Sequence, residues 1–325
     1  MKKVLIYIIA FCFITSSCNI SKPIALSDNI ILRNYQPFTE FNKTARLSET
    51  ATLKLEHDLP KIDGATALYP LYAAFVQAIY PEGDYFYQSR GNFTTYEEPL
   101  VGASTTASAY NRLIEGKVDI IFCAKPSIEQ TEMVRNNGME FIMIPIGSEA
   151  FVFFINVKNP VSNISTDDII GIYSGRITNW SKLGGNRSEI RAYQRTKNSG
   201  SQTMLESIMG EEKLINSKTE NELTFMLDII NRTADYRNYR NALGFSFLFY
   251  TTQMVQNNNI KLLSINNILP TKETIQNGTY PYCDNFYAII LNNNTDNENI
   301  NLFIKWILSE QGQYLVEKTG YVPIR

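Results

Sequence analysis

The sequence predicts an α/β fold built on a mostly parallel sheet, and two observations carry that prediction. Short apolar runs of strand length alternate with segments of helical apolar spacing, and the turns between them are short. Several helical segments also begin with hydroxyl-bearing or small residues, which are common start signals of helices. With 325 residues, of which 44% are hydrophobic and 19% charged, the chain is long enough for two domains and a sizeable core.

The N-terminal residues have the pattern of an export signal. Lys2 and Lys3 precede an apolar run of about a dozen residues, and small residues then lead to Cys18. The run is too short to span a bilayer, so we interpret residues 1–17 as a signal peptide. A cysteine directly after small residues resembles the bacterial lipoprotein signal, although Thr15 stands where such signals usually carry leucine. We therefore expect lipidation at Cys18 and a place in the cell envelope, in the periplasm or on the outer face of a bacterial membrane. A plain secretory signal is the alternative.

The body of the protein is expected to start after a polar N-terminal stretch. Residues 18–60 are weakly patterned and are predicted to form a tether followed by a segment that lies along the body. Residues 62–64 read as a short strand, followed by a turn of small residues. From Leu68 to Ile79 the apolar residues recur at helical spacing for three turns, with Pro70 in the first turn, where a missing N–H is tolerated.

The same order of elements recurs along the chain. A turn at residues 102–106 leads into a helix that Gly116 ends, and residues 118–123 form a buried strand. Residues 141–145 and 151–157 are predicted to form two further strands. Ser165 and Asp168 form a capping box at the start of a helix that the glycines at 184 and 185 end. Residues 301–308 are expected to be the last amphipathic helix.

Three of the turns share one design. Each places hydroxyl-bearing or small residues at the start of a helix, namely Thr66-Ala67-Leu68, Thr105-Thr106-Ala107 and Ser199-Gly200-Ser201. The first N–H groups of a helix have no internal partner, so such turns are suited to binding anions. Arg195, four residues before Ser199, adds a fixed positive charge that an oxyanion accepts. One such turn is an ordinary cap, and Ser199 with Gln202 also fits a capping box. Three of them favour a shared oxyanion site.

Composition argues against several other kinds of function. Net charge is −2 and no basic block stands out, which argues against nucleic acid as a main partner. The chain has no CxxC and no His/Cys cluster, so we expect neither a metal site nor a cofactor. Outside the signal and Cys18, only Cys123 and Cys283 remain, and they are either a disulfide or two buried thiols. His57 is the only histidine and lies in the polar N-terminal stretch, so a Ser-His-Asp triad is not expected.

Five motifs together resemble one family. They are residues 63–70, residues 172–185, Arg195 with residues 199–201, residues 242–245 and residues 320–323. In this order and spacing they are similar to the periplasmic phosphate-binding proteins of high-affinity phosphate ABC transporters, over about residues 63–325. The resemblance implies a two-lobed fold of the type II periplasmic binding proteins. Its expected divisions are lobe I at residues 61–147 and 281–325, and lobe II at residues 148–280.

The resemblance also implies which residues bind phosphate. In the first turn these are Thr66, Ala67 and Leu68, and the second turn contributes a hydroxyl at Thr106, next to Thr105. The third turn contributes Arg195, Ser199, Gly200 and Ser201.

One position departs from the family. The best-known members carry an aspartate just after the strand that Asp119 begins, as the acceptor for the phosphate proton, and here the matching residue is Ala124. Asp63 or Glu149 is a candidate for that role. Lys125 either adds positive charge at the cleft or is a solvated loop residue.

The leading expectation is a lipid-anchored, monomeric solute-binding protein, not an enzyme, that captures inorganic phosphate or a similar oxyanion for an ABC permease. Two alternatives remain open. One is a phosphate-sensing or surface-binding lipoprotein without transport. The other is a phosphoester hydrolase that uses Ser199 or Ser201 as a nucleophile, with Lys125 or Lys197 as its base.

Overall fold

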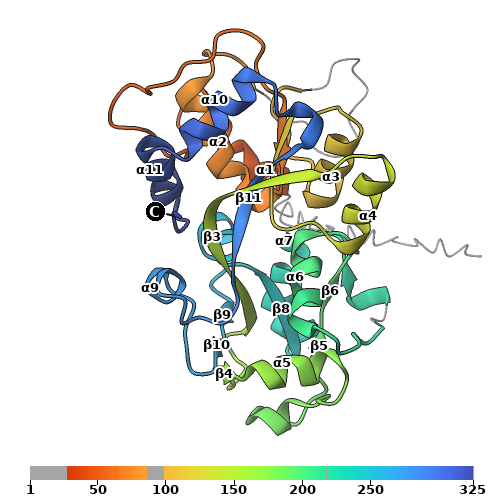
Figure 1. Ribbon diagram of the computed structural model, residues 1–325. Helices are drawn as coiled ribbons and strands as arrows, with labels where there is room; N and C mark the ends of the chain where they lie inside the picture. Colours follow the sequence, from red (N-terminus) through yellow and green to blue (C-terminus); the bar gives the residue numbers. More distant parts are fainter. Residues whose placement is uncertain (1–27, 86–98, 217–218, 325) are drawn as a thin grey trace, which may run out of the picture.

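The computed structural model describes residues 28–85, 99–216 and 219–324. The expected signal peptide and Cys18 lie outside the described residues. Two separate clusters of buried side chains form the cores of two lobes, with two long strands running between them (Figure 1). The chain passes from the first core to the second between Ile146 and Ala150, and back between Tyr282 and Phe286.

Lobe I contains two short parallel strands, β1 (Ile62–Gly64) and β2 (Ile120–Cys123), both buried. The helices around them are α1 (Asp28–Arg33), α2 (Tyr69–Ile79), α3 (Thr106–Ile114), α4 (Ile128–Asn136), α10 (Glu298–Ile307) and α11 (Glu310–Thr319). The strand, turn and helix expected from residue 62 to residue 79 are all present, with the turn forming the 3₁₀ helix η1 (Thr66–Leu68). The strand expected at residues 118–123 is also confirmed.

The strands that join the lobes are β3 (Phe141–Asn156) and β11 (Cys283–Leu291), which pair antiparallel along nearly the whole of β11. The prediction of two strands at 141–145 and 151–157 was wrong, because they are one strand of 16 residues. In the fold, a Cβ on Gly147 would lie 2.4 Å from the Phe286 ring, so glycine allows β11 to pack closely here while β3 continues.

Lobe II continues the same sheet with β5 (Arg191–Ala192), β8 (Ala242–Phe247) and β9 (Ile260–Leu262). Its small strand pairs are β4 (Asn163–Ile164) with β10 (Ser264–Ile265) and β6 (Gln194–Arg195) with β7 (Glu222–Leu223). Its helices are α5 (Thr166–Tyr173), α6 (Gly200–Met209), α7 (Met226–Ala234), α8 (Tyr236–Tyr239) and α9 (Lys272–Gln276). The sheet is mixed rather than mostly parallel. Strands β1–β2 and β5–β8 are parallel, whereas β3 and β11 run antiparallel to their neighbours in it.

The end of one helix and the number of C-terminal helices differ from the prediction. The capping box at Ser165 is present, with Asp168 N–H donating to Ser165 Oγ and Ser165 N–H donating to the Asp168 carboxylate. The helix that it starts ends at Tyr173, because Gly175 adopts a left-handed φ of 82° there. The helix expected last, α10, is followed by α11. In the part of the chain that the structure describes, no helix is both long and apolar enough to cross a membrane.

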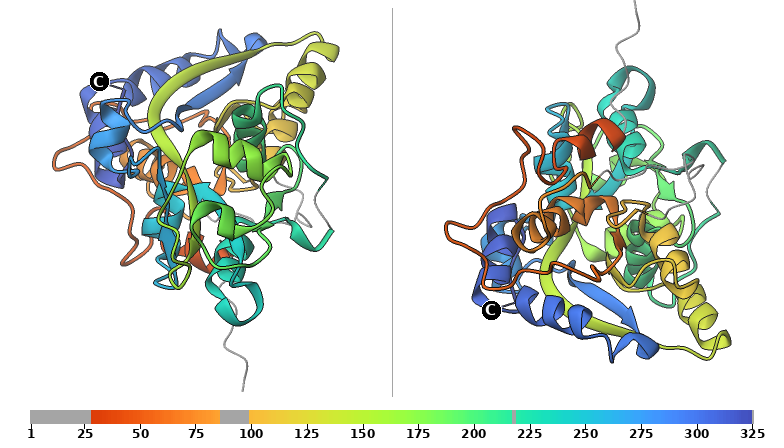
Figure 2. Two further views of the ribbon diagram at one scale, coloured as in Figure 1. Left: turned by 90° about the horizontal axis from the view of Figure 1, so that it is seen from below. Right: turned by 90° about the horizontal axis from the view of Figure 1, so that it is seen from above.

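The segment before β1 packs on lobe I, beside the C-terminal helices (Figure 2). Leu32 and Leu55 are buried in the core of lobe I. The Thr52 N–H donates to Gln311 on α11 at 2.8 Å, and Asn299 on α10 donates to the backbone carbonyl of His57 at 2.9 Å. The segment therefore belongs structurally to lobe I.

Candidate anion-binding site

The three turns meet in one small cavity between the lobes. It has a volume of about 40 Å³ and is lined by eight of the nine predicted site residues, which are Thr66, Ala67, Thr105, Thr106, Arg195, Ser199, Gly200 and Ser201. Since one water needs roughly 10–15 Å³ of cavity volume, the cavity holds about three water-sized groups. That size fits a small oxyanion.

The first turn offers backbone donors. Within the described residues, the N–H groups of Thr66 and Ala67 have no acceptor, whereas the N–H of Leu68 donates to the carbonyl of Ala65 at 2.9 Å. Leu68 also lies outside the small cavity and lines a larger one beside it. The first turn therefore presents two N–H groups to the cavity rather than three.

The second turn is held in a strained conformation. Thr105, which precedes α3, has a φ of 91°, which is unfavourable for a β-branched residue. This conformation places Thr106 at the first position of α3, where a helix N–H has no partner within the helix. Both threonines line the cavity.

Asp63 ties the second turn to the first. Its carboxylate accepts hydrogen bonds from Gly64 N–H at 2.7 Å and from the N–H and Oγ of Ser104 at 2.8 and 2.6 Å. It also pairs with Arg112 Nε at 2.9 Å. Gly102 is required here, because a Cβ would lie 2.8 Å from the Asp63 carboxyl carbon. Burial raises the pKa of Asp63, and the bonds from Ser104 and the charge of Arg112 oppose that rise. Asp63 is fully buried and does not line the cavity.

The third turn combines a helix start with Arg195. Arg195 ends β6 and is only 7% exposed. Its Nε and NH2 donate to the carbonyls of Leu223 and Thr224 at 3.0 and 2.7 Å, and its NH1 lies 3.3 Å from Ser201 Oγ. The guanidinium is thus fixed at the cavity wall. Among the described lining residues of the small cavity, Arg195 is the only charged one.

The capping box expected at Ser199 is half formed. Ser199 Oγ accepts from Gln202 N–H at 3.3 Å, so Ser199 caps α6. The Gln202 side chain instead accepts from Arg195 N–H at 2.9 Å, which joins β6 to the helix. For the N–H groups of Gly200 and Ser201, the described part of the chain offers no acceptor. The capping and anion-binding interpretations are therefore compatible.

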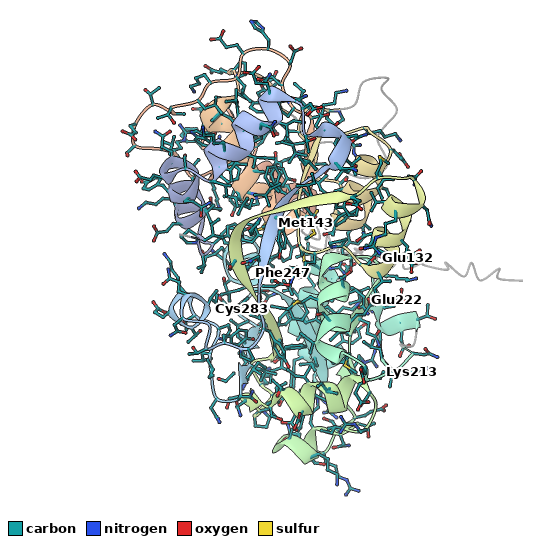
Figure 3. All side chains as sticks on the ribbon, in the orientation of Figure 1. Glu132, Met143, Lys213, Glu222, Phe247 and Cys283 are labelled. Carbon is teal, nitrogen blue, oxygen red and sulfur yellow. The ribbon has the colours of Figure 1, made fainter. Side chains whose placement is uncertain are left out.

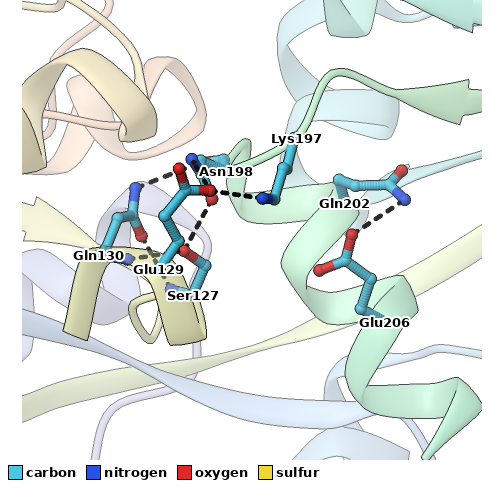
Figure 4. A network of polar contacts seen from close by, with 7 residues as sticks. All are labelled: Ser127, Glu129, Gln130, Lys197, Asn198, Gln202 and Glu206. Atoms are coloured by element: carbon cyan, nitrogen blue, oxygen red, sulfur yellow. Dashed lines mark hydrogen bonds and ion pairs between the residues drawn. The ribbon is translucent and has the colours of Figure 1, made fainter. Parts of the chain in front are cut away.

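The lobes are in contact around the cavity. A Cβ on Gly200 of lobe II would lie 3.0 Å from Thr106 Oγ1 of lobe I. Beside it, a polar latch consists of Ser127 and Glu129 at the start of α4 and Lys197 and Asn198 before α6 (Figure 4). Ser127 Oγ lies 2.8 Å from Asn198 Oδ1, Asn198 Nδ2 donates to Glu129 at 3.1 Å, and Lys197 pairs with Glu129 at 2.7 Å.

Sequence reasoning missed four apolar lining residues, which are Ala65, Phe225, Met226 and Phe247. Phe247 ends β8, and Figure 3 shows it at the level where the crossing strands pass between the lobes. It follows the motif at residues 242–245 by two positions, which is the one signal in the sequence that points to it. Phe225 and Met226 stand at the start of α7, and nothing in their local sequence indicates a cavity.

The other candidate residues lie away from the small cavity. Ala124, Lys125 and Glu149 line the larger cavity, and Lys125 is exposed and pairs with Asp284 at 2.9 Å. His57 is exposed on the surface of lobe I. Cys123 and Cys283 are free thiols, so they do not form a disulfide. In the residues that the structure describes, no three His, Cys, Asp or Glu side chains are grouped to hold a metal ion.

Comparisons with known proteins agree with this architecture. The family model described as a PBP superfamily domain matches residues 56–311. The phosphate-binding protein PstS of Bacillus subtilis is 25% identical over 271 residues, which is 81% of this chain and 80% of the relative. The phosphate-binding protein PstS of Borreliella burgdorferi is 27% identical over 186 residues, or 54% of this chain, and the match spans 64% of that relative's own length. These relatives are named as binding proteins, not as enzymes.

Solved structures bear out the two-lobed fold. A Clostridium perfringens protein described as a phosphate ABC transporter substrate-binding protein, solved with bound phosphate, superposes with a TM-score of 0.61 at 21% identity. The likeness covers 81% of this chain and 98% of the other. An ABC-type phosphate transport receptor from Vibrio cholerae gives a TM-score of 0.56 at 20% identity, over 80% of this chain and 98% of the other. At these identities the likeness concerns the fold.

Proposed function

The chain belongs to the PBP superfamily, and from that membership we propose that it captures inorganic phosphate between its lobes and delivers it to an ABC permease. One observation carries the proposal, namely that eight hydroxyl, small or cationic residues from three distant turns line one cavity between touching lobes. The relatives named as phosphate-binding proteins support the choice of ligand.

Binding rests on neutral donors around one positive charge. Backbone N–H groups of Thr66, Ala67, Gly200 and Ser201 supply hydrogen bonds, and Arg195 supplies the charge. Charge-assisted hydrogen bonds are stronger than neutral ones, and the burial of these groups keeps competing water away.

Selectivity among oxyanions depends on what accepts the proton of phosphate, and Ala124 stands where the family resemblance implies an aspartate. Within the described lining of the small cavity there is no carboxylate to accept the proton of phosphate. The hydroxyl oxygens of Thr66, Thr106 and Ser199 accept hydrogen bonds as well as donate them, so a protonated phosphate oxygen still has partners. We therefore extend the proposal to related tetrahedral oxyanions such as arsenate.

The experiment that tests the proposal is calorimetric titration of residues 19–325 with phosphate. Arg195→Ala is expected to weaken binding by a factor of about 100 or more, equivalent to about 3 kcal/mol, because the fixed charge is lost. Arg195→Lys retains the charge but loses the planar fork, and is expected to recover part of the affinity. Arg176→Ala, an exposed arginine on the same lobe, is the matched control and should bind as the unaltered protein does. Equal affinity in Arg195→Ala and Arg176→Ala would refute this site.

The proposal extends to the setting of the protein. We propose that it acts as a monomer held to the membrane by a lipid at Cys18, with the permease as its partner. A role in sensing phosphate without transport uses the same site and differs only in the partner.

A further inference from the structure

A second, larger cavity adjoins the anion site. Its volume is about 390 Å³, within the range of roughly 300–1,000 Å³ that holds small organic ligands. The two cavities share Ala65, Ala67, Thr106, Gly200 and Phe247 as lining residues. Three of these five have no side chain beyond Cβ, so little stands between an anion in the small cavity and the space beside it.

This cavity is present while the lobes are in contact. Ser127 lines it and at the same time makes the latch hydrogen bond to Asn198 across the lobes. Gly200 and Thr106, which approach each other from opposite lobes, also belong to its wall. The space therefore coexists with lobe contact and is not merely the gap of separated lobes.

Much of the wall is apolar. Leu68, Ile128, Phe151, Met204 and Phe286 all line it. Inorganic phosphate occupies only the small cavity and makes no use of this surface. An apolar group placed there would instead be removed from water, which is favourable by about 25 cal/mol per Å².

Among the described residues that line the larger cavity, no unpaired buried charge faces an uncharged guest. Lys125 and Asp284 pair with each other at 2.9 Å, and Glu206 is exposed to solvent. Glu149 is 8% exposed, and one of its carboxylate oxygens accepts from Phe249 N–H at 2.6 Å. Burial raises the pKa of Glu149 to about 8, so it is mostly uncharged at pH 7.

We propose that the site also binds phosphoryl compounds that carry one small, uncharged organic substituent, such as phosphate monoesters and phosphonates. Three phosphoryl oxygens would occupy the donors of the small cavity, and the fourth position of the tetrahedron would direct the substituent past Ala65, Ala67 and Gly200 into the larger cavity. The proposal rests on the proposed function, because it uses the same phosphoryl donors.

Phenylphosphonate tests the proposal, since it cannot be hydrolysed to phosphate and its ring suits an apolar wall. In calorimetry on residues 19–325, we expect its affinity to be within about tenfold of that of inorganic phosphate. Met204 lines the larger cavity only. Met204→Trp, which fills that space, should lower the affinity for phenylphosphonate by about tenfold or more. It should change the affinity for phosphate by less than about twofold. Met204→Leu conserves volume and is the control for both ligands.

The outcomes separate this proposal from the function on which it rests. Binding of phosphate without phenylphosphonate would overturn the proposal and leave the function intact. Equal phenylphosphonate affinity in Met204→Trp and Met204→Leu would show that the ring lies elsewhere, and would also overturn it. Binding of neither ligand would remove the proposed function, and this inference with it. Unchanged phosphate binding in Met204→Trp shows in the same titration that the variant is folded.

Discussion

Asp63 shows how a residue outside the ligand cavity determines the shape of the site. Its carboxylate accepts from Gly64 beside the first turn and from Ser104 beside the second, so one side chain fixes the distance between the two. Arg112, 9% exposed, balances its charge. An aspartate at this position is therefore a positioning residue, and the sequence motif in which it occurs reflects support for the turns rather than contact with the ligand.

We expect Asp63→Asn to lower the free energy of unfolding by about 3–5 kcal/mol, because an amide cannot accept all of these bonds or balance Arg112. Urea denaturation measures the change. Asp119→Asn is the matched control, since Asp119 is half-buried and accepts from Lys61 N–H at 2.7 Å. The Asp119→Asn control should lower the free energy of unfolding by about 1 kcal/mol. If the two variants are equally stable, the buried pair does not have the role described here.

Glu149 makes stability depend on pH. Burial raises its pKa from 4.5 to about 8. A folded-state pKa above the unfolded one means that the native protein holds the proton more tightly. The stabilisation is therefore complete below about pH 4.5 and is lost as pH rises toward 8.

Glu149→Gln, which keeps the acceptor for Phe249 N–H, should remove this dependence. We expect the variant to match the unaltered protein near pH 4.5 and to exceed it by roughly 3–5 kcal/mol near pH 8. Urea denaturation at the two pH values measures the difference. A difference in the free energy of unfolding that is the same near pH 4.5 and near pH 8 would contradict the explanation.

At the scale of elements, the loop before α6 joins the lobes. Asn198 has a φ of 64°, and this left-handed backbone turns its side chain toward α4. The eight predicted residues that line the small cavity are 2–7% exposed or half-buried, whereas Phe225, which also lines it, is 38% exposed. We expect separation of the lobes and opening of the latch to widen the entrance for a ligand. We therefore expect the strength of the latch to affect how long a bound anion stays.

Asn198→Gly tests the effect of the latch on anion release without straining the backbone, because glycine tolerates a positive φ. Loss of the two side-chain hydrogen bonds is expected to weaken phosphate binding about tenfold, mainly through faster dissociation. Stopped-flow displacement measures the rate. Lys197→Ala is the control, since the Lys197 side chain is 74% exposed and surface ion pairs contribute little. The latch has no such role if Asn198→Gly releases phosphate at the same rate as the unaltered protein.

Local signals determined which elements the sequence could predict. The turn at residues 66–68 and the cap at Ser165 depend on neighbours within a few residues, and both are as expected. The prediction of two strands in place of β3 was wrong because the close packing at Gly147 involves the Phe286 ring, 139 positions away in the chain. The latch between Ser127 and Asn198 and the cavity wall at Phe225 are likewise long-range contacts, which no local pattern indicates.

The whole molecule is organised around β3 and β11, which pass through both lobes. The resemblance in five motifs implied a two-lobed fold, although the residues of the crossing themselves suggested two separate strands. For the same reason the predicted half-sites in each lobe came together, whereas the larger cavity beside them was not foreseen. Its wall draws on α4, α6 and the crossing strands at once.

The membrane anchor is a prediction at this scale. Cys18→Ser should move the protein to the soluble fraction of fractionated cells, because it removes the proposed site of the lipid. The unaltered protein should be found with the membranes. Cys283→Ser, which removes a thiol at the crossing strand, is the control and should not change the distribution. Equal distributions for all three proteins would exclude lipidation at Cys18.

The packing of residues 28–60 and of α10 and α11 on lobe I has a mechanical consequence. Both the first and the last described segments are attached to lobe I, and the described chain enters lobe II along β3 and returns along β11. An attachment at either segment, such as a lipid, an affinity tag or a sensor surface, therefore holds lobe I directly. Lobe II is not held by that attachment. If phosphate binding moves the lobes as proposed, we expect a fluorophore on lobe II of a tethered molecule to change its distance from the support when phosphate is added.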